Sequence, residues 1–193
     1  MGDTCGSRPD RSNGPERFRI ETARTADLGQ LERAAIVELC SWAHGVDFGG
    51  LFSLLPRDGL HVIARREAEV VGHAVLTTRW LRPGPLPFLR SGYVDAVATA
   101  PTAQHRGIGS AVMRRLAEAA EADGFELGGL ESELRGFYEP LGWLRWRGPL
   151  AAMTPAGLVP TPDQEGVFVL RLARTPLLYI DGPLTVRADG RFW

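Results

Sequence analysis

A glycine-containing loop between a strand and a helix constrains the fold more than any other part of the chain. Residues 93–99 alternate in the way a strand does, and residues 109–123 repeat apolar side chains at helical spacing. Between them, residues 104–109 read Gln-x-x-Gly-x-Gly, with Arg106 inside. Glycines let the backbone approach a ligand closely, and the first N–H groups of a helix bind anions. The segment therefore predicts an anion-binding loop within an α/β fold.

Two common nucleotide-binding motifs do not describe this loop. A phosphate loop of the Walker type needs Gly-Lys-Ser/Thr, and the chain contains no lysine. A dinucleotide fold needs Gly-x-Gly-x-x-Gly after an early strand, with an acid about 20 residues further on. A helix start that binds no ligand remains an alternative at this point.

Hydrophobic periodicity predicts further elements on both sides of the loop. Apolar residues from Leu28 to Trp42, including Leu31, predict a helix, and a short helix follows residue 134 until Pro140 and Gly142 end it. Residues 1–17 are expected to form a flexible tail, and residues 148–166, with four prolines, are expected to be loop-rich. The expected strands are 18–22, 61–66, 70–81, 92–99, 125–130, 143–147 and 167–172, with weak strand character after residue 175.

Composition excludes several classes of protein. The 193 residues suit one domain, and a hydrophobic content of 44% supports a sizeable core. A formal net charge of −1 argues against a nucleic-acid partner. Cys5 and Cys40 are far apart and predict neither a disulfide framework nor a metal site. The polar start and the absence of 18 consecutive apolar residues predict no signal peptide and no membrane span, so a cytoplasmic protein is expected.

Two signatures in the second half of the chain resemble those of one enzyme family. The Gln-x-x-Gly-x-Gly loop resembles the acetyl-coenzyme A pyrophosphate loop of the GCN5-related N-acetyltransferases (GNAT). Residues 137–143, Phe-Tyr-Glu-Pro-Leu-Gly-Trp, resemble that family's Tyr-Glu-x-Leu-Gly-Phe signature. The resemblance covers residues 18–172. It implies an α/β fold with a mixed, mostly antiparallel sheet of about seven strands flanked by about four helices. Residues 18–193 would form a single domain with a C-terminal extension on the substrate side.

A narrower resemblance is to the aminoglycoside 2′-N-acetyltransferases. Its motifs are Gly-Tyr-Val-Asp-x-Val-Ala at 92–98, Gly-Trp-Leu-x-Trp-x-Gly-Pro at 142–149, Thr-Pro-Asp at 161–163, Val-Phe-Val-Leu at 167–170 and the terminal Trp193. It implies transfer of an acetyl group from acetyl-coenzyme A to an amine of an antibiotic, with resistance as the outcome. Related enzymes often form homodimers, so a homodimer is expected.

The resemblance assigns catalytic roles to three residues. Asp95 stands where the family has a carboxylate, and it would act either as a base through water or as an anchor for the cationic substrate; both readings remain open. The backbone N–H of Val97, at a strand bulge, would hold the developing oxyanion. Tyr138 would protonate the leaving thiolate, although a tyrosine here could also serve only in packing.

The expected acetyl-coenzyme A site follows the strand end into the glycine loop. Arg106 and the amides of residues 107–110 would bind the pyrophosphate. The complete expected set is Val97, Ala98, Thr99, Gln104, His105, Arg106, Gly107, Ile108, Gly109 and Ser110, and no metal is expected.

The expected substrate pocket draws on distant segments, namely Asp47, Phe52, Asp95, Asp163, Glu165 and Trp193. A polycationic aminoglycoside calls for several acids, yet Phe52 stands near a position where the resembling enzymes have one, and Arg191 lies close to the terminus. Fewer acids suit a substrate with fewer amines that also carries a carboxylate. Kasugamycin, an atypical aminoglycoside with an amine and a carboxy-imino group, fits this description.

Three other functions stay open on the sequence. Within the same fold, the acceptor could be another small amine or a peptide or protein amine. A domain of a different class would bind acetyl-coenzyme A only to regulate, and Asp95 and Tyr138 argue against it because they supply catalytic groups. A purely structural module would leave the glycine loop unexplained.

Overall fold

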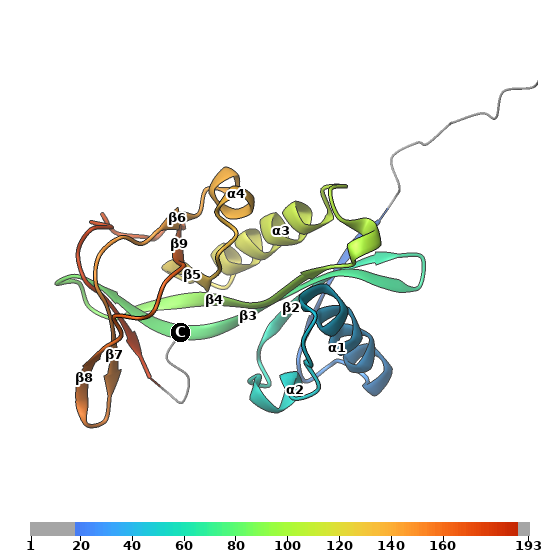
Figure 1. Ribbon diagram of the computed structural model, residues 1–193, viewed down its shortest axis with the longest axis horizontal. Coiled ribbons are helices and arrows are strands. Elements are labelled where there is room, and N and C mark those ends of the chain that lie inside the picture. The colour runs from blue at the N-terminus through green and yellow to red at the C-terminus, as the bar shows by residue number, and fades with distance from the viewer. Residues whose placement is uncertain (1–17, 189–193) are drawn as a thin grey trace, which may run out of the picture.

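A single mixed β-sheet forms the centre of the molecule in the computed structural model, which describes residues 18–188 (Figure 1). The tail predicted for residues 1–17, together with Arg191 and Trp193, lies outside the described residues. The sheet order is β6-β9-β5-β4-β3-β10-β7-β8, and β2 joins β1 to β3. The strands are β1 (Arg19–Arg24), β2 (Leu60–Arg66), β3 (Glu69–Pro83), β4 (Leu89–Thr99), β5 (Leu127–Glu131), β6 (Leu144–Arg145), β7 (Leu150–Thr154), β8 (Gly157–Pro160), β9 (Val167–Arg171) and β10 (Leu184–Arg187).

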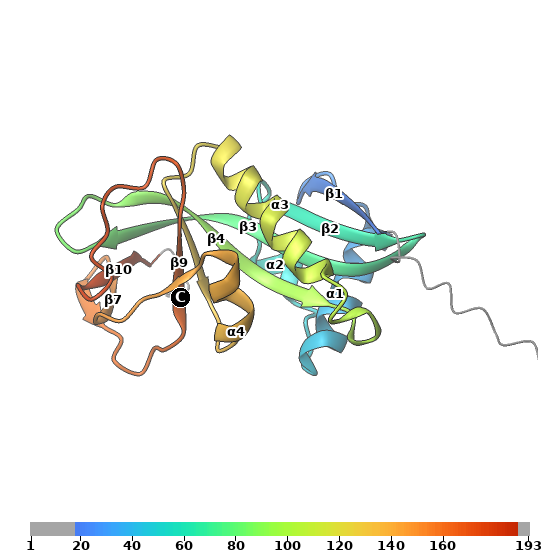
Figure 2. The ribbon, with the colours of Figure 1, turned by 90° about the horizontal axis from the view of Figure 1, so that it is seen from above.

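Helices cover both faces of this sheet. α3 and α4 lie on one face, and α1 and α2 lie on the other (Figures 1 and 2). The described helices are α1 (Gln30–His44), α2 (Leu51–Leu54), α3 (Ile108–Ala122) and α4 (Arg135–Tyr138), with 3₁₀ turns η1 (Pro101–Ala103) and η2 (Glu139–Leu141). The expected fold class is confirmed, since all strand pairs are antiparallel in the described part of the chain except β4–β5 and β7–β10.

The main core lies between these helices and the sheet. Ile36 and Leu39 of α1 are buried on one side, and Val112 and Leu116 of α3 are buried on the other. Each such side chain contributes about 1.5–3 kcal/mol by leaving water. Burial on both faces explains why β3 and β4 carry apolar runs rather than strict alternation.

The apolar stripe predicted for α1 is partly wrong. Leu31 is 89% exposed and Trp42 is 52% exposed, whereas Ile36 and Cys40 are fully buried. An α-helix has 3.6 residues per turn. The packed residues in the middle of α1, Ile36 to Cys40, determine which of its faces meets the sheet, and apolar residues nearer its ends can lie on another face.

The loop predicted at residues 148–166 is also wrong in part, because it contains the hairpin of β7 and β8. β10 then pairs with β7 in parallel and with β3 in antiparallel fashion. These strands raise the sheet from the expected seven strands to ten among the described residues. The prolines do not interrupt the hairpin: Pro149 and Pro155 flank its strands, and Pro160 ends β8, which is paired on one side only.

One long edge of β3 is shared by two strands. β2 pairs with β3 between Glu69 and Leu76, and β10 pairs with β3 between Leu81 and Pro83. Residues 77–80 of β3 lie between these two pairings, while β4 follows the opposite edge along the whole stretch. This interval opens into one of the cavities described below.

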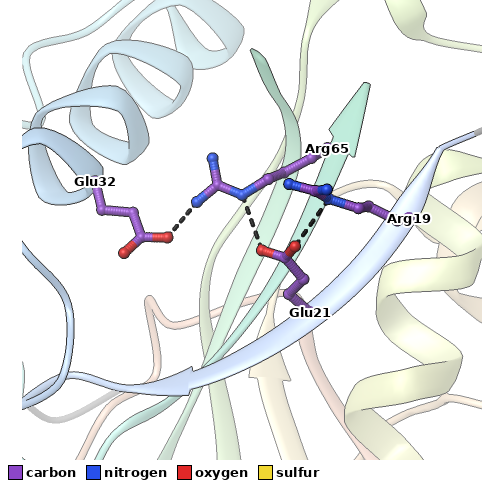
Figure 3. Close-up of polar contacts among 4 residues, drawn as sticks. All are labelled: Arg19, Glu21, Glu32 and Arg65. Atoms are coloured by element: carbon purple, nitrogen blue, oxygen red, sulfur yellow. Dashed lines mark hydrogen bonds and ion pairs between the residues drawn. The ribbon is translucent and has the colours of Figure 1, made fainter. Parts of the chain in front are cut away.

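A polar cluster ties β1, β2 and α1 together (Figure 3). Arg65 of β2 donates from Nε to Glu21 Oε2 of β1 at 2.9 Å, and its Nη2 donates to Glu32 of α1. Arg19 adds an ion pair with the other oxygen of Glu21 at 2.8 Å. The Arg65 side chain is 13% exposed, so its guanidinium bridges two elements from a largely buried position.

Candidate active site

The glycine loop begins a helix whose first amides face a cleft. Gly107 precedes α3 with φ at +81°, a left-handed conformation that glycine adopts without a steric penalty. Gly109 is in close contact with its surroundings: a Cβ there would lie 3.1 Å from Thr99 Oγ1 and 3.2 Å from Phe137 Cζ. The N–H groups of the first helical residues have no partner within the helix, and the helix dipole adds positive charge there. The loop therefore fits a phosphate group.

The strand leading to this loop separates from its neighbour. β4 and β5 pair only between residues 91–94 and 127–130. Beyond that point, β4 continues to Thr99, whereas the chain after β5 turns into α4. A cleft of about 640 Å³ lies there, and its lining includes residues from both departing segments.

This cleft brings together most of the predicted acetyl-coenzyme A site. Its lining contains Val97, Ala98, Thr99, Gln104, His105, Gly107, Ile108, Gly109 and Ser110, together with Phe137 and Tyr138. Of the predicted set, Arg106 is exposed on the same loop but does not line the cleft. Nothing in the sequence pattern indicated that His44 of α1 would also line it; His44 Nε2 lies 3.0 Å from the carbonyl oxygen of Val97.

A β-bulge interrupts β4 at the predicted position. His73 of β3 pairs with Ala98, and Val75 pairs with Asp95, so Ala96 and Val97 together face the single residue Ala74. Ala96 has φ at +51°, in the left-handed region that alanine seldom occupies. A bulge re-aims the backbone groups on either side of it, and here it re-aims them beside the cleft.

Tyr138 lies at the inner wall of the cleft among aromatic rings. The side chain is 4% exposed, and its ring centroid lies 4.8 Å from Phe137, 6.2 Å from Trp143 and 5.8 Å from Phe168. Burial raises the pKa of Tyr138 to about 12, and a hydrogen bond with Ser132 opposes part of that rise. The hydroxyl therefore keeps its proton at neutral pH.

Asp95 lines a second cavity, of about 330 Å³. This cavity lies at residues 77–80 of β3, between the part of β3 that pairs with β2 and the part that pairs with β10. Its Oδ2 lies 3.5 Å from Arg79 Nη2 and 3.5 Å from Thr77 Oγ1. Arg79 stacks over the Tyr93 ring at 3.9 Å, and its Nη1 is buried without a hydrogen-bond partner. Arg187 of β10 and residues 54–56 complete the wall. Asp95 and Val97 are two residues apart, so one strand contributes to both cavities.

The other predicted substrate residues lie elsewhere. Asp47 is exposed, and its Oδ1 accepts a hydrogen bond from the Gly49 amide at 2.7 Å, which is a turn contact. Phe52 of α2 stacks on His61 at 5.6 Å. Asp163 is exposed, and Glu165 lies 3.7 Å from Arg145 beside a third cavity. Neither main cavity is lined by any of the four.

Arg79 and Arg187 are the charged residues of the second cavity that sequence reasoning missed. Alternation along β3 places Thr77 and Arg79 on the same face, but nothing local indicates that β10 brings Arg187 beside them. Among residues 18–188, no cluster of His, Cys, Asp and Glu could hold a metal ion. No helix in that range is long and apolar enough to cross a membrane.

Comparisons with known proteins agree on one family. Residues 28–143 match the model of the acetyltransferase (GNAT) family. An aminoglycoside 2′-N-acetyltransferase of Mycolicibacterium fortuitum is 31% identical over 178 residues, which cover 89% of this chain and 90% of the relative.

Solved structures share the fold at low sequence identity. The GNAT family N-acetyltransferase YhbS of Escherichia coli, solved in complex with CoA, has a TM-score of 0.63 at 13% identity and covers 95% of this chain and 98% of its own. Eis1 of Mycobacterium abscessus has a TM-score of 0.59 at 18% identity and covers 70% of this chain. The chain spans 33% of the length of Eis1.

Proposed function

The chain belongs to the GNAT acetyltransferase family, and on that premise we propose that it transfers the acetyl group of acetyl-coenzyme A to the 2′-amino group of an aminoglycoside. The observation that carries the proposal is the meeting of the glycine loop, the bulge and Tyr138 in one cleft, two residues along β4 from the carboxylate of Asp95. The 31% identity to an aminoglycoside 2′-N-acetyltransferase supports the class of acceptor.

The donor half of the reaction uses mainly backbone groups. The amides at the start of α3 bind the pyrophosphate of acetyl-coenzyme A, and Arg106, exposed on the same loop outside the cleft, adds positive charge beside it. The N–H of Val97 donates a hydrogen bond to the thioester oxygen and stabilises the negative charge that develops there. Tyr138 keeps its proton at neutral pH and gives it to the departing sulfur.

The acceptor half uses side chains. Asp95 binds the ammonium form of the substrate, and the amine loses its proton to water before it attacks. The cavity also presents Arg79 and Arg187, so it combines one acid with two cations. A polycation suits such a cavity poorly, whereas a substrate with both an amine and a carboxylate suits it well. Kasugamycin has both groups and is the proposed acceptor.

Release of coenzyme A thiol measures this function directly. The panel contains kasugamycin, two aminoglycosides with a free 2′-amine, a polyamine and a lysine peptide. Turnover with kasugamycin alone is the expected result. Turnover with the polycationic drugs and not with kasugamycin overturns the choice of acceptor. Tight acetyl-coenzyme A binding without turnover of any amine would favour a regulatory domain.

The biological setting of the proposal can be tested in cells. Because the proposed reaction uses acetyl-coenzyme A, we propose that the protein acts in the cytoplasm and confers resistance there. Expression in a susceptible strain should raise the inhibitory concentration of kasugamycin, and Tyr138→Phe should abolish that rise. We also propose a homodimer, which light scattering of the purified protein measures.

A further inference from the structure

The peptide between Ala96 and Val97 is held in an unfavourable conformation. A left-handed alanine costs about 1–2 kcal/mol, and Ala96 has φ at +51°. The two polar groups of a trans peptide lie in one plane and point in opposite directions. The carbonyl of Ala96 and the N–H of Val97 belong to the same peptide. Whatever holds that carbonyl therefore also aims the N–H.

The group that holds the carbonyl is the imidazole of His73. Its Nδ1 lies 2.9 Å from the Ala96 oxygen, and the side chain is fully buried on β3. Cys40 Sγ lies 3.8 Å from the same oxygen, but a thiol is a weak donor. His73 therefore makes the strong contact.

His73 is one member of a buried hydrogen-bonded chain. His73 Nε2 lies 2.8 Å from His61 Nδ1, and His61 Nε2 lies 3.0 Å from the hydroxyl of Thr25. His61 is fully buried, and Thr25 is 4% exposed. The chain runs from β4 through β3 and β2 to the end of β1.

Both imidazoles are neutral at pH 7. Burial lowers the pKa of His73 to about 4, against the smaller opposing effect of the Ala96 carbonyl. Burial, helped by the nearby His73 and Arg33, lowers the pKa of His61 to about 3. A neutral imidazole has one N–H and one acceptor nitrogen.

The contacts then allow one arrangement of hydrogens. A carbonyl can only accept, so His73 Nδ1 donates to Ala96 and His73 Nε2 accepts. His61 Nδ1 must donate to that nitrogen, so His61 Nε2 is an acceptor. The Thr25 hydroxyl, 3.0 Å away, then donates its one hydrogen to His61 rather than to the Gly59 carbonyl oxygen, which lies 3.2 Å from it. Each ring thus fixes the tautomer of the next, and the chain ends on the carbonyl of the bulge.

A pair of buried imidazoles adds little net stability, because each hydrogen bond replaces one made to water. The pair does fix the direction in which the Ala96 carbonyl, and with it the Val97 N–H, points. We propose that His73, with its tautomer set by His61 and Thr25, is a positioning residue that aims the N–H of Val97 at the thioester carbonyl of acetyl-coenzyme A. The identity of the donor rests on the proposed function; the hydrogen-bonded chain rests on the geometry alone.

Infrared spectroscopy of bound acetyl-coenzyme A labelled with ¹³C at the thioester carbonyl tests this role. In the wild-type protein, the hydrogen bond from Val97 should lower the carbonyl stretching frequency below that of the free thioester. His73→Leu should return the frequency toward the free value and lower kcat about 10²-fold. KM for acetyl-coenzyme A should change little, because the pyrophosphate loop is untouched. His73→Asn keeps an N–H donor near the position of Nδ1 and should restore most of both quantities.

Cys40→Ala is the matched control, since it removes a buried atom that contacts the same carbonyl and should leave the stretching frequency unchanged. A His73→Leu protein with wild-type frequency and kcat overturns the proposal. Nitrogen-15 NMR of the wild-type protein needs no variant: both histidines should be protonated at Nδ1, and a hydrogen on His73 Nε2 overturns the proposal. Wild-type protein that binds no acetyl-coenzyme A overturns this proposal and the proposed function together. Binding without turnover of any amine overturns the proposed function alone, because the infrared and NMR measurements on the bound and free protein still test His73.

Discussion

At the scale of single residues, the site combines side chains, which a substitution can remove, with a backbone N–H group, which a substitution leaves in place. Tyr138 and Asp95 contribute side chains, so each can be deleted cleanly. Val97 contributes a backbone N–H that every residue except proline retains. Side-chain variants therefore report on proton transfer and acceptor binding, and the bulge must be tested through the residues that hold it.

Replacing Tyr138 with Phe should lower kcat about 10²-fold, because the proton donor for the thiolate is lost. The ring contacts with Phe137 and Trp143 remain, so the dissociation constant of acetyl-coenzyme A should not change. Steady-state kinetics and calorimetry measure the two quantities. Tyr179→Phe, at a tyrosine 73% exposed, is the control. An unchanged kcat in Tyr138→Phe would limit this residue to packing.

Replacing Asp95 with Asn should lower kcat/KM for the amine about 10–100-fold, the value of one charge-assisted hydrogen bond. Asp95 already contacts a guanidinium and a hydroxyl, a setting suited to binding an ammonium group, so we expect the loss mainly in KM. Initial rates over a range of amine concentrations separate the two constants. Asp58→Asn, an exposed carboxylate outside the cavity, is the control. A loss confined to kcat would instead assign Asp95 the role of base.

At the scale of elements, local patterns predicted what local interactions determine. Alternation and glycine spacing located β4, the loop and α3, because each depends on neighbours in the sequence. The β7–β8 hairpin is local, but it was missed because the four prolines of residues 148–166 indicated a loop. The place of β10 beside β3 was missed because strand pairing over about a hundred residues leaves no local signal. The cleft beside the glycine loop was therefore predictable to a large extent, and the cavity beside Asp95, which needs Arg187 from β10, was not.

Replacing Arg65 with Met should lower the free energy of unfolding by about 1–2 kcal/mol, because Glu21 and Glu32 lose a bridge but remain partly solvated. Urea unfolding measures the change. Arg19→Met is the matched control: its side chain is 65% exposed and pairs with Glu21, so the loss should stay below about 0.5 kcal/mol. Equal losses in the two variants would show that the link to α1 adds nothing.

At the scale of the whole molecule, the two buried histidines couple stability to pH. The pKa of each lies below the ordinary value of 6.5, at about 3 for His61 and about 4 for His73. Below pH 6.5 the unfolded chain therefore binds protons that the folded protein does not bind until near pH 4. Stability should fall as pH decreases through this range, by up to about 1.4 kcal/mol per pH unit for each histidine.

Urea unfolding between pH 7.5 and 4.5 measures this slope. His61→Asn removes one of the two titrating rings and should reduce the slope by about one proton, that is, about 1.4 kcal/mol per pH unit. Carboxylates contribute equally to the pH dependence of the wild-type protein and of the variant. The difference between the two curves of unfolding free energy against pH therefore reports the contribution of His61. Parallel curves would contradict the prediction.

Residues of β4 line two separate cavities, and this arrangement affects how such a protein can evolve. The groups proposed to bind the pyrophosphate and the thioester oxygen are mainly backbone amides, so a codon change there leaves the donor in place wherever the backbone keeps its conformation. The cavity beside Asp95 is built from the side chains of Thr77, Arg79 and Arg187, on strands that border it from different directions. A single nucleotide change can alter its charge while the other half keeps its chemistry. If the two cavities have the proposed roles, lineages can exchange one acceptor for another without first rebuilding the catalytic cleft.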